Sequence, residues 1–391
     1  MRENTTLFQN TSTKSIDMTA YMTYVQSDRC REAEAAYRAK DYTKSVALYA
    51  ADADEGNCFA KTRLALYHHY GEGVTKDQQK ALDLFREAAE EGCPLAACWI
   101  AEYLWTGKVC AKDQDTAETI YESALPDVRK IADAGDMYAK YFYAYNLLLG
   151  ICLEIDEVEA FQMLQESADK GCDAARIRLA SCYVNGDGTG TDYLKALELL
   201  HDDSYEEAAQ RLNLLGSIYL FGKGIQADKD LGIYYLEQAA AMGYVRAKTA
   251  MAAYYYDNPG QGHMEKAIYW YTICADQDHD AFAASMLAYI YYHGADEDVK
   301  VEPDGEKMWK YYLCAAMYDE NYTAYMVNIA WEYYNGSIFG GKYVHEDKDE
   351  AYKWMKKAAQ AGSQYAKEVL AQQDGDWTKV SAKNPFTLFP Y

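Results

Sequence analysis

Adjacent histidines and two cysteines in the first third of the chain are the residues best suited by type to hold a metal ion. His68 and His69 are neighbours, and Cys93 and Cys98 follow them. Imidazole and thiolate groups are the common ligands of zinc, usually in pairs at short fixed spacings. The spacing here fits no common ligand pattern. We therefore expect packed side chains and no metal or cofactor, with a four-ligand site as the alternative.

The chain contains no motif of a known catalytic or nucleotide-binding site. HExxH, a CxxC pair, GxSxG and a phosphate-binding glycine loop are all missing from the sequence. Gly71 and Gly73 resemble part of a glycine loop but fall where a helix is expected to end. We therefore expect no enzymatic activity and no catalytic residue, although a site assembled from distant segments would leave no such signature.

Composition narrows the class of protein and of partner. The 391 residues are 50% apolar, with only 6 prolines and 39 tyrosines, and carry a net charge of -23. Low proline content suits a helical chain, since proline breaks helix interiors. The negative charge argues against binding to nucleic acid and to anionic membrane surfaces. Acidic faces keep a long repeat array soluble, or they complement a basic protein partner, and both interpretations stay open.

The sequence predicts a cytoplasmic location. The first residues, MRENTTLFQNTSTKS, lack the apolar core of a signal peptide, and no run of 18 apolar residues exists that would insert in a membrane. Ten cysteines follow no regular spacing. We expect them to be reduced thiols that pack as small hydrophobic side chains.

One unit of helix, turn and helix, residues 60–96, recurs along most of the chain. The residue that ends its first helix is followed by counterparts at steps of 36, 43, 36, 36, 36, 36 and 42 residues. These positions are Gly71, Gly107, Gly150, Gly186, Gly222, Asn258, Gly294 and Gly336. Each is expected to leave the helix in a left-handed conformation, which glycine adopts freely and asparagine tolerates.

Aspartates recur in a second register, just before the second helix of each unit. They are Asp41, Asp77, Asp113, Asp156, Asp192, Asp228, Asp304 and Asp347, and His263 replaces the aspartate in one unit. An aspartate at a helix N-cap accepts a hydrogen bond from a free backbone amide, worth about 1 kcal/mol. We therefore expect structural caps rather than catalytic acids.

The second helices share small residues at fixed positions, such as Ala81, Phe85, Ala88 and Ala89. Alanines allow two helices to approach closely while the large residue fills the remaining space. We divide the chain into an N-terminal segment (1–17, disordered or loosely docked), a capping helix pair (18–59), eight repeats (60–366) and the end of a capping helix with an aromatic tail (367–391). The fourth unit is degenerate around 201–209, and long loops are expected at 294–307 and 336–350.

The repeated leucine, small residue, tyrosine, glycine, aspartate and Ala-Ala-x-x-Gly pattern resembles the Sel-1-like repeat family, relatives of tetratricopeptide repeats. The segment LLGSIYLFGKGIQADKDLGIYYLEQAAAMGYVRA (214–247) and the opening unit match best. The resemblance implies an all-α, right-handed α/α superhelical solenoid of antiparallel helix pairs. It also implies an adaptor or scaffold, often bacterial. Some secreted members carry a disulfide in each repeat, which the irregular cysteines here do not support.

The first helices are expected to line the inner face of the solenoid. Positions 9, 5 and 2 before each exit residue lie on one stripe. Aromatic residues on this stripe are Trp105, Tyr145, Tyr256, Tyr289, Tyr292, Trp331 and Tyr334. Tyrosine and tryptophan anchor many interfaces, because they bury a large area with few rotatable bonds. Either these residues bind a protein or peptide, or they fill the seams between repeats.

Two functions follow as hypotheses. The first is a non-enzymatic scaffold or adaptor that binds a protein or peptide on its concave face. The alternative is a regulatory or inhibitory subunit whose acidic surface occludes a basic enzyme or toxin. The tail residues Phe386, Leu388, Phe389 and Tyr391 either cap the last helix or form a linear motif. Capping is favoured, because an exposed apolar end promotes aggregation.

Overall fold

The computed structural model describes residues 27–201, 209–258, 260–296, 300–339 and 341–371. The helix expected from Met18, most of the degenerate segment of the fourth unit and the aromatic tail lie outside these residues. The chain divides into an N-terminal unit, Met1–Glu206, and a C-terminal unit, Glu207–Tyr391. The expected all-α solenoid of antiparallel helix pairs is confirmed.

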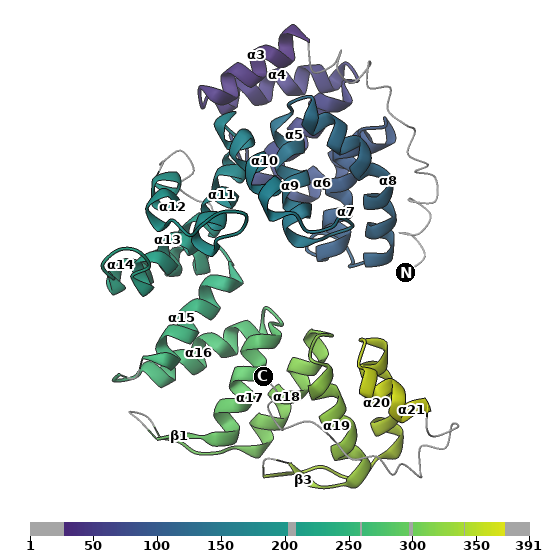
Figure 1. Ribbon diagram of the computed structural model, residues 1–391, viewed down its shortest axis with the longest axis vertical. Helices are drawn as coiled ribbons and strands as arrows, with labels where there is room; N and C mark the ends of the chain where they lie inside the picture. The colour runs from purple at the N-terminus through teal and green to yellow at the C-terminus, as the bar shows by residue number, and fades with distance from the viewer. Residues whose placement is uncertain (1–26, 202–208, 259, 297–299, 340, 372–391) are drawn as a thin grey trace. The chain divides into compact units, whose positions relative to one another are not determined.

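The N-terminal unit consists of consecutive helix pairs (Figure 1). Its helices are α3 (Asp28–Arg38), α4 (Tyr42–Asp54), α5 (Cys58–Tyr70), α6 (Gln78–Glu90), α7 (Pro94–Thr106), α8 (Gln114–Asp133), α9 (Met137–Leu149), α10 (Glu157–Asp169), α11 (Asp173–Asn185) and α12 (Tyr193–Leu200). Helix α8 is longer than its counterparts and contains Pro126, as the 43-residue step predicts.

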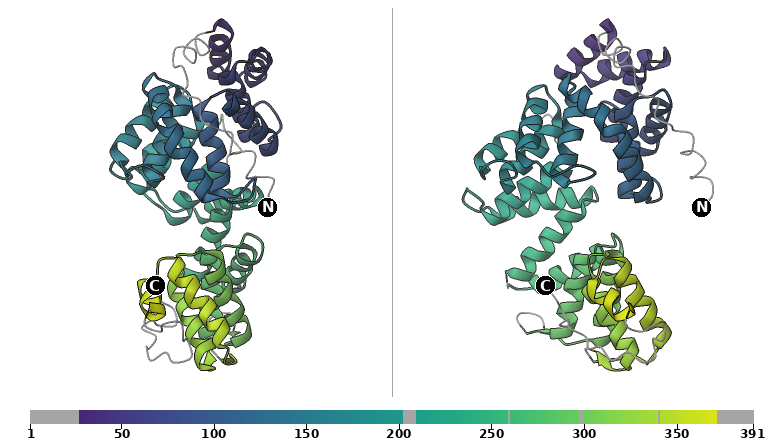
Figure 2. Two further views of the ribbon diagram at one scale, coloured as in Figure 1. Left: turned by 90° about the vertical axis from the view of Figure 1, so that its right-hand side faces the viewer. Right: turned by 45° about the vertical axis from the view of Figure 1, so that its right-hand side comes forward.

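The C-terminal unit repeats the same pairing (Figure 2). Its elements are α13 (Ala209–Phe221), α14 (Lys229–Ala241), α15 (Val245–Asp257), α16 (His263–Asp276), α17 (Ala281–His293), β1 (Ala295–Asp296), β2 (Lys300–Val301), α18 (Gly305–Tyr318), α19 (Thr323–Asn335), β3 (Ile338–Phe339), β4 (Lys342–Tyr343), α20 (Lys348–Gln360) and α21 (Gln364–Ala371). The two long loops form short antiparallel ladders, which the sequence did not predict.

The repeated aspartates are helix caps, as expected. Asp77 accepts a hydrogen bond from the Lys80 amide at 2.9 Å, and Asp228 accepts one from the Leu231 amide at 3.0 Å. The Asp77 amide in turn donates to the carbonyl of His68 at 2.9 Å. Asp77 therefore caps the second helix and ties it to the end of the first, and Asp113, Asp192, Asp228, Asp304 and Asp347 make the same backbone bond, which explains why the aspartates recur in register.

The glycine exits have the expected positive φ, although Gly294 combines φ +71° with ψ -177°, and the asparagine exit does not. Gly71 has φ +87°, and an added Cβ would lie 3.0 Å from the Lys76 Cβ. Asn258 instead has φ -118°, so the prediction of a left-handed residue there is wrong. The loop between α15 and α16 is one residue shorter than the loops of the other repeats. Gly262, at the start of α16, is left-handed in it, with φ +71°.

The N-terminal and the C-terminal unit each bury a core of alanines and large apolar residues. Ala81, Phe85 and Ala88 of α6 are fully buried. Helices α13 and α14 approach closely at a glycine: a Cβ on Gly232 of α14 would lie 2.5 Å from the Leu220 backbone nitrogen. Only glycine fits there, because α13 and α14 meet backbone to backbone.

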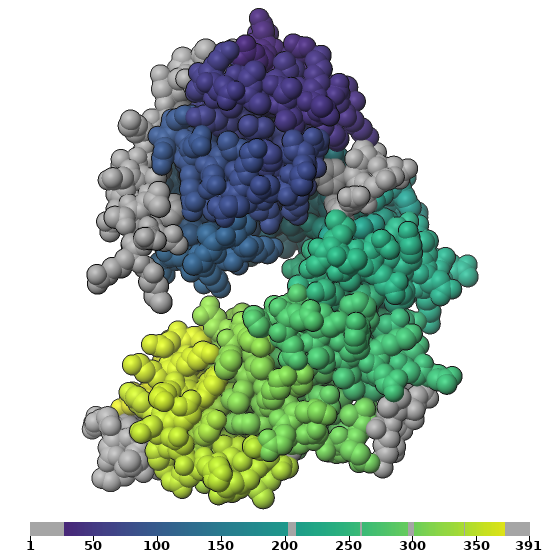
Figure 3. Space-filling model, turned by 180° about the vertical axis from the view of Figure 1, so that it is seen from behind, coloured from purple at the N-terminus to yellow at the C-terminus, as the bar shows by residue number. Residues whose placement is uncertain are grey.

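In the N-terminal unit, side chains of the capping pair α3–α4 contact helices that come much later in the sequence. The Tyr37 ring lies 6.2 Å from the Tyr138 ring of α9. The Tyr42 hydroxyl donates to the Asp173 carboxylate of α11 at 3.3 Å. These contacts join the capping pair to α9 and α11, and Figure 3 shows the purple α3–α4 pair packed against the helices that follow.

We expect thiol reagents to distinguish the cysteines by burial. All ten are free; Cys152 is exposed, Cys110 and Cys314 are half-buried, and the others are buried. Burial raises the pKa of Cys172 to about 12, so little reactive thiolate forms there. In the native chain, mass spectrometry should find rapid labelling at Cys152, slower labelling at the two half-buried positions and none at Cys172. As a control, all ten cysteines should be labelled once the chain is denatured. Fast labelling of Cys172 in the native chain would contradict this packing.

Candidate protein-binding surface

The C-terminal unit carries a stripe of tyrosines on successive first helices. Tyr256 lies on α15, Tyr289 and Tyr292 lie on α17, and Tyr334 lies on α19. All four side chains are half-buried. Because successive repeats of a solenoid stack in the same orientation, we expect a common position on their first helices to face the same side. We call these four residues the tyrosine stripe.

Trp331 does not belong to the exposed part of the stripe. Its side chain is only 4% exposed, and its ring lies 5.4 Å from the Tyr334 ring in an edge-to-face contact. Tyr365 of the final helix α21 lies against the indole. Trp331 therefore packs between Tyr334 and α21, and its buried ring does not present a surface to a partner.

Neighbouring side chains hold the stripe in place. The Tyr289 ring lies 4.4 Å from the His293 ring, and the Tyr292 ring makes an edge-to-face contact with His293 at 4.8 Å. The Lys348 ammonium lies 3.4 Å from the Tyr334 ring centre. Side chains that are already ordered lose less conformational entropy on binding, so this arrangement favours tight contact with a partner.

Trp105 and Tyr145 form a separate cluster in the N-terminal unit. The Trp105 ring lies 6.4 Å from Tyr121, whose hydroxyl donates to Glu102 at 3.0 Å. Burial raises the pKa of Glu102. The Arg178 guanidinium lies 4.7 Å above the Tyr145 ring and covers one of its faces. Both rings are half-buried, as those of the tyrosine stripe are, so their contact with a partner stays a prediction.

The histidines and cysteines near the start of the chain are packing residues. His68 is 8% exposed, and burial lowers the pKa of His69 to about 3. The His69 Nδ1 lies 2.5 Å from the Tyr103 hydroxyl. The Cys93 sulfur accepts a hydrogen bond from the Thr62 hydroxyl at 3.1 Å. Within the described residues, no three His, Cys, Asp or Glu side chains are placed to hold a metal ion.

Part of the negative charge is already neutralised within the C-terminal unit. Lys248 pairs with Asp278 at 2.8 Å, and Lys310 pairs with Asp276 at 3.0 Å. Burial, more than the neighbouring carboxylates, raises the pKa of Asp280, which also caps α17. The net charge of -23 already includes the lysines of these pairs, so the acidic excess that a basic partner would meet lies on other residues. None of the helices described combines the length and apolar character needed to span a bilayer.

A family model for the Sel1 repeat matches seven segments: 59–93, 138–172, 173–201, 212–244, 246–279, 281–317 and 323–363. The chain belongs to the Sel1 repeat family. Residues 94–137 fall outside these matches, although α7 and α8 form a helix pair there with the usual glycine exit and aspartate cap. Sel1 repeat proteins generally mediate protein–protein interactions and are typically non-enzymatic scaffolds.

Relatives extend over part of the chain. The Sel1-repeat-containing protein YjcO of Escherichia coli is 28% identical over 160 residues, covering 39% of this chain and 69% of YjcO. The solved structure of c5321, a protective antigen of uropathogenic Escherichia coli, shares 25% identity and a TM-score of 0.41, covering 84% of this chain and 66% of that one. The immunity protein PA5088 of Pseudomonas aeruginosa shares 21% identity and a TM-score of 0.36, covering 58% and 81%.

Proposed function

We propose that this Sel1 repeat protein is a non-enzymatic scaffold that holds a protein or peptide partner on the tyrosine stripe of its C-terminal unit. The proposal rests on one observation: half-buried tyrosines recur two residues before the helix exit in α15, α17 and α19, as Tyr256, Tyr292 and Tyr334, and half-buried Tyr289 lies one turn earlier on α17. At the same positions the preceding helix α13 carries Ser217 and the buried Leu220. The stripe is therefore a local feature of the chain and is not a requirement of the repeat.

The chemistry of tyrosine suits this role. A half-buried ring has lost part of its rotational freedom, and its exposed edge offers an apolar surface together with a hydroxyl that donates or accepts hydrogen bonds. An extended peptide or a helix that crosses α15, α17 and α19 would contact the stripe at several points. Binding dominated by such contacts resists salt, whereas binding through the acidic surface weakens as salt screens the charges.

A cytoplasmic location is consistent with this proposal. Ten free thiols, most of them buried, suit a reducing compartment. The acidic-occluder alternative stays a prediction, and salt dependence separates it from the scaffold. Recovery of the partner that persists at high salt supports the tyrosine stripe.

The test is affinity capture from the native cell with a stripe variant and a matched control. Tyr289→Ala/Tyr292→Ala removes two anchors, and we expect partner affinity to fall by at least about 30-fold, the equivalent of losing one interface hot spot of about 2 kcal/mol. Tyr234→Ala/Tyr269→Ala removes two tyrosines that are 54% and 59% exposed on the second helices α14 and α16. This control should recover the partner as the wild type does.

Thermal unfolding of both variants completes the test. We expect midpoints close to that of the wild type, because the stripe tyrosines are half-buried. Full partner recovery by the stripe variant would contradict the proposal. A large loss of stability in the stripe variant alone would show that the tyrosines fill seams.

A further inference from the structure

The N-terminal unit exposes apolar side chains along one edge of its helix pairs. Among the residues described in this unit, the large apolar side chains that are exposed are Leu149 (50%), Ile155 (63%), Val158 (57%) and Leu194 (60%). They lie at the end of α9 and at the starts of α10 and α12 (Figure 1). We call these four residues the apolar edge. Single exposed apolar residues are normal, whereas a group of them in neighbouring repeats is typical of an interaction site.

The repeat register shows that the fold does not require apolar residues at this edge. Val158 and Leu194 are each the second residue of a second helix, two positions after its aspartate cap. In the other second helices with such a cap, the same position holds a polar residue: Thr43, Gln79, Asp115, Asp230, Glu306 and Asp349. Only α10 and α12, in consecutive repeats, carry an apolar side chain there. The packing of a repeat therefore does not account for it.

Loop contacts join the two helix pairs that carry the apolar edge. A Cβ added to Gly150 would lie 2.9 Å from Cγ1 of Ile155, so Ile155 packs against the exit of α9, directly beyond Leu149. The loop between α11 and α12 lies on the start of α10, where a Cβ on Gly188 would lie 2.0 Å from the Glu157 carbonyl oxygen. The Gly188 amide also donates to the Glu157 carboxylate at 3.3 Å. The turns of these two pairs therefore form one continuous edge.

Carboxylates without a cation partner accompany the apolar edge. Glu154 and Glu157 are exposed within it. Burial and the charges of Glu118 and Glu122 raise the pKa of Cys152, so these two exposed carboxylates of α8 lie near the loop between α9 and α10. Within the described residues, none of these four glutamates forms an ion pair with a lysine or arginine. The apolar edge therefore carries an excess of negative charge.

The combination of apolar and acidic groups selects the kind of partner. A second copy of the chain would bring another net charge of -23 against these glutamates, and an anionic membrane would repel them as well. An uncharged apolar surface would bury the carboxylates without a partner, which is unfavourable. An amphipathic helix with lysines or arginines beside its apolar stripe satisfies both kinds of group at once.

We propose that the apolar edge docks a basic amphipathic helix of a partner protein. The apolar stripe of that helix covers Ile155 and Val158, and its cations pair with the glutamates beside them. The proposal is independent of the tyrosine stripe, because the apolar edge lies wholly in the N-terminal unit. Salt should weaken this contact, whereas binding on the tyrosine stripe should resist salt.

Fluorescence anisotropy of the full chain with labelled peptides tests the proposal. The probe is the amidated peptide LKKLLKLLKKLLKL, whose leucines share one face of a helix. The two control peptides are a scramble of the same composition and a version with glutamate in place of every lysine. At low salt we expect the probe to bind at least about tenfold more tightly than either control, because only the probe offers both an apolar stripe and cations.

Variants locate the binding. Ile155→Ser/Val158→Ser should weaken the probe at least about tenfold and leave the thermal midpoint unchanged, because both side chains are more than half exposed. Met242→Ser/Met317→Ser removes side chains that are 50% and 56% exposed in the C-terminal unit and should bind as the wild type does. Failure of the probe to bind, equal binding of either control peptide, or equal binding by the two double variants would overturn the proposal.

Sedimentation of the full chain separates this partner from a second copy. The proposal predicts that Ile155→Ser/Val158→Ser leaves the oligomeric state of the chain unchanged. A wild-type dimer that this variant dissociates would assign the apolar edge to contact between two copies and would also overturn the proposal.

Discussion

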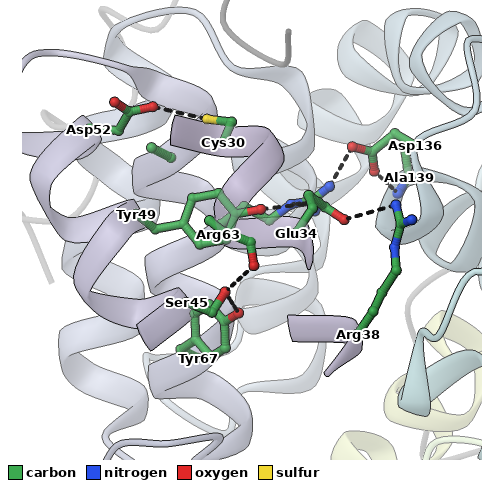
Figure 4. Close-up of polar contacts among 12 residues, drawn as sticks. Cys30, Glu34, Arg38, Ser45, Tyr49, Asp52, Arg63, Tyr67, Asp136 and Ala139 are labelled. Atoms are coloured by element: carbon green, nitrogen blue, oxygen red, sulfur yellow. Dashed lines mark hydrogen bonds and ion pairs between the residues drawn. The ribbon is translucent and has the colours of Figure 1, made fainter. Parts of the chain in front are cut away.

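Replacing Arg63 by alanine is expected to destabilise the N-terminal unit by about 3–5 kcal/mol, because it leaves the buried Asp136 carboxylate without its cation (Figure 4). Asp136 has a side chain that is 5% exposed and bonds to Arg63 at 2.5 Å. The substitution also removes the guanidinium from between Phe59 and Tyr138. Hydrogen exchange of α3, α5 and α9 in the full chain measures the effect, since it reports local opening free energies.

Two further variants show whether charge or packing carries this effect. Arg38→Ala removes an exposed arginine of the same region and should cost less than about 1 kcal/mol. Arg63→Met/Asp136→Asn removes both charges, retains a side chain of similar length and keeps an acceptor that caps α9. It should recover much of the lost stability. Equal exchange rates in Arg63→Ala and the wild type would contradict the buried ion pair.

Replacing Trp331 by alanine is expected to cost the C-terminal unit about 3–5 kcal/mol, the usual range for deleting a large buried aromatic side chain. The indole is 4% exposed and lies between Tyr334 and the final helix. Thermal unfolding and hydrogen exchange of α19 and α21 measure this loss. Tyr289→Ala on the neighbouring first helix is the control and should cost far less, because Tyr289 is half-buried. Unchanged exchange in α19 would contradict the buried placement of Trp331.

Local features of the fold are predictable from the sequence. The aspartate caps and glycine exits depend on hydrogen bonds and backbone angles within a few residues, so a fixed register reveals them. Asn258 departs from its expected conformation because the shortened loop moves the left-handed turn to Gly262. The small ladders β1–β2 and β3–β4 were missed, because two-residue strands leave almost no periodic signal.

Features set by contacts between distant residues are not predictable in this way. The same stripe position holds the half-buried Tyr289 in α17 and the buried Trp331 in α19. Tyr365 of α21 contacts Trp331, and the repeat register gives no sign of this contact between helices. Arg63 and Asp136 are 73 residues apart, and neither breaks the repeat pattern. This buried ion pair of the N-terminal unit therefore becomes visible only in three dimensions.

Photo-crosslinking from individual positions tests the central claim, that the partner lies on the tyrosine stripe. A benzoylphenylalanine replaces Tyr289 or Tyr292 in one pair of chains, and Tyr234 or Tyr269 in the other pair. The proposal predicts a crosslinked partner band from Tyr289 and Tyr292 and none from the second-helix positions, at low and at high salt. Crosslinks formed only from Tyr234 or Tyr269, or lost from every position at high salt, would contradict it.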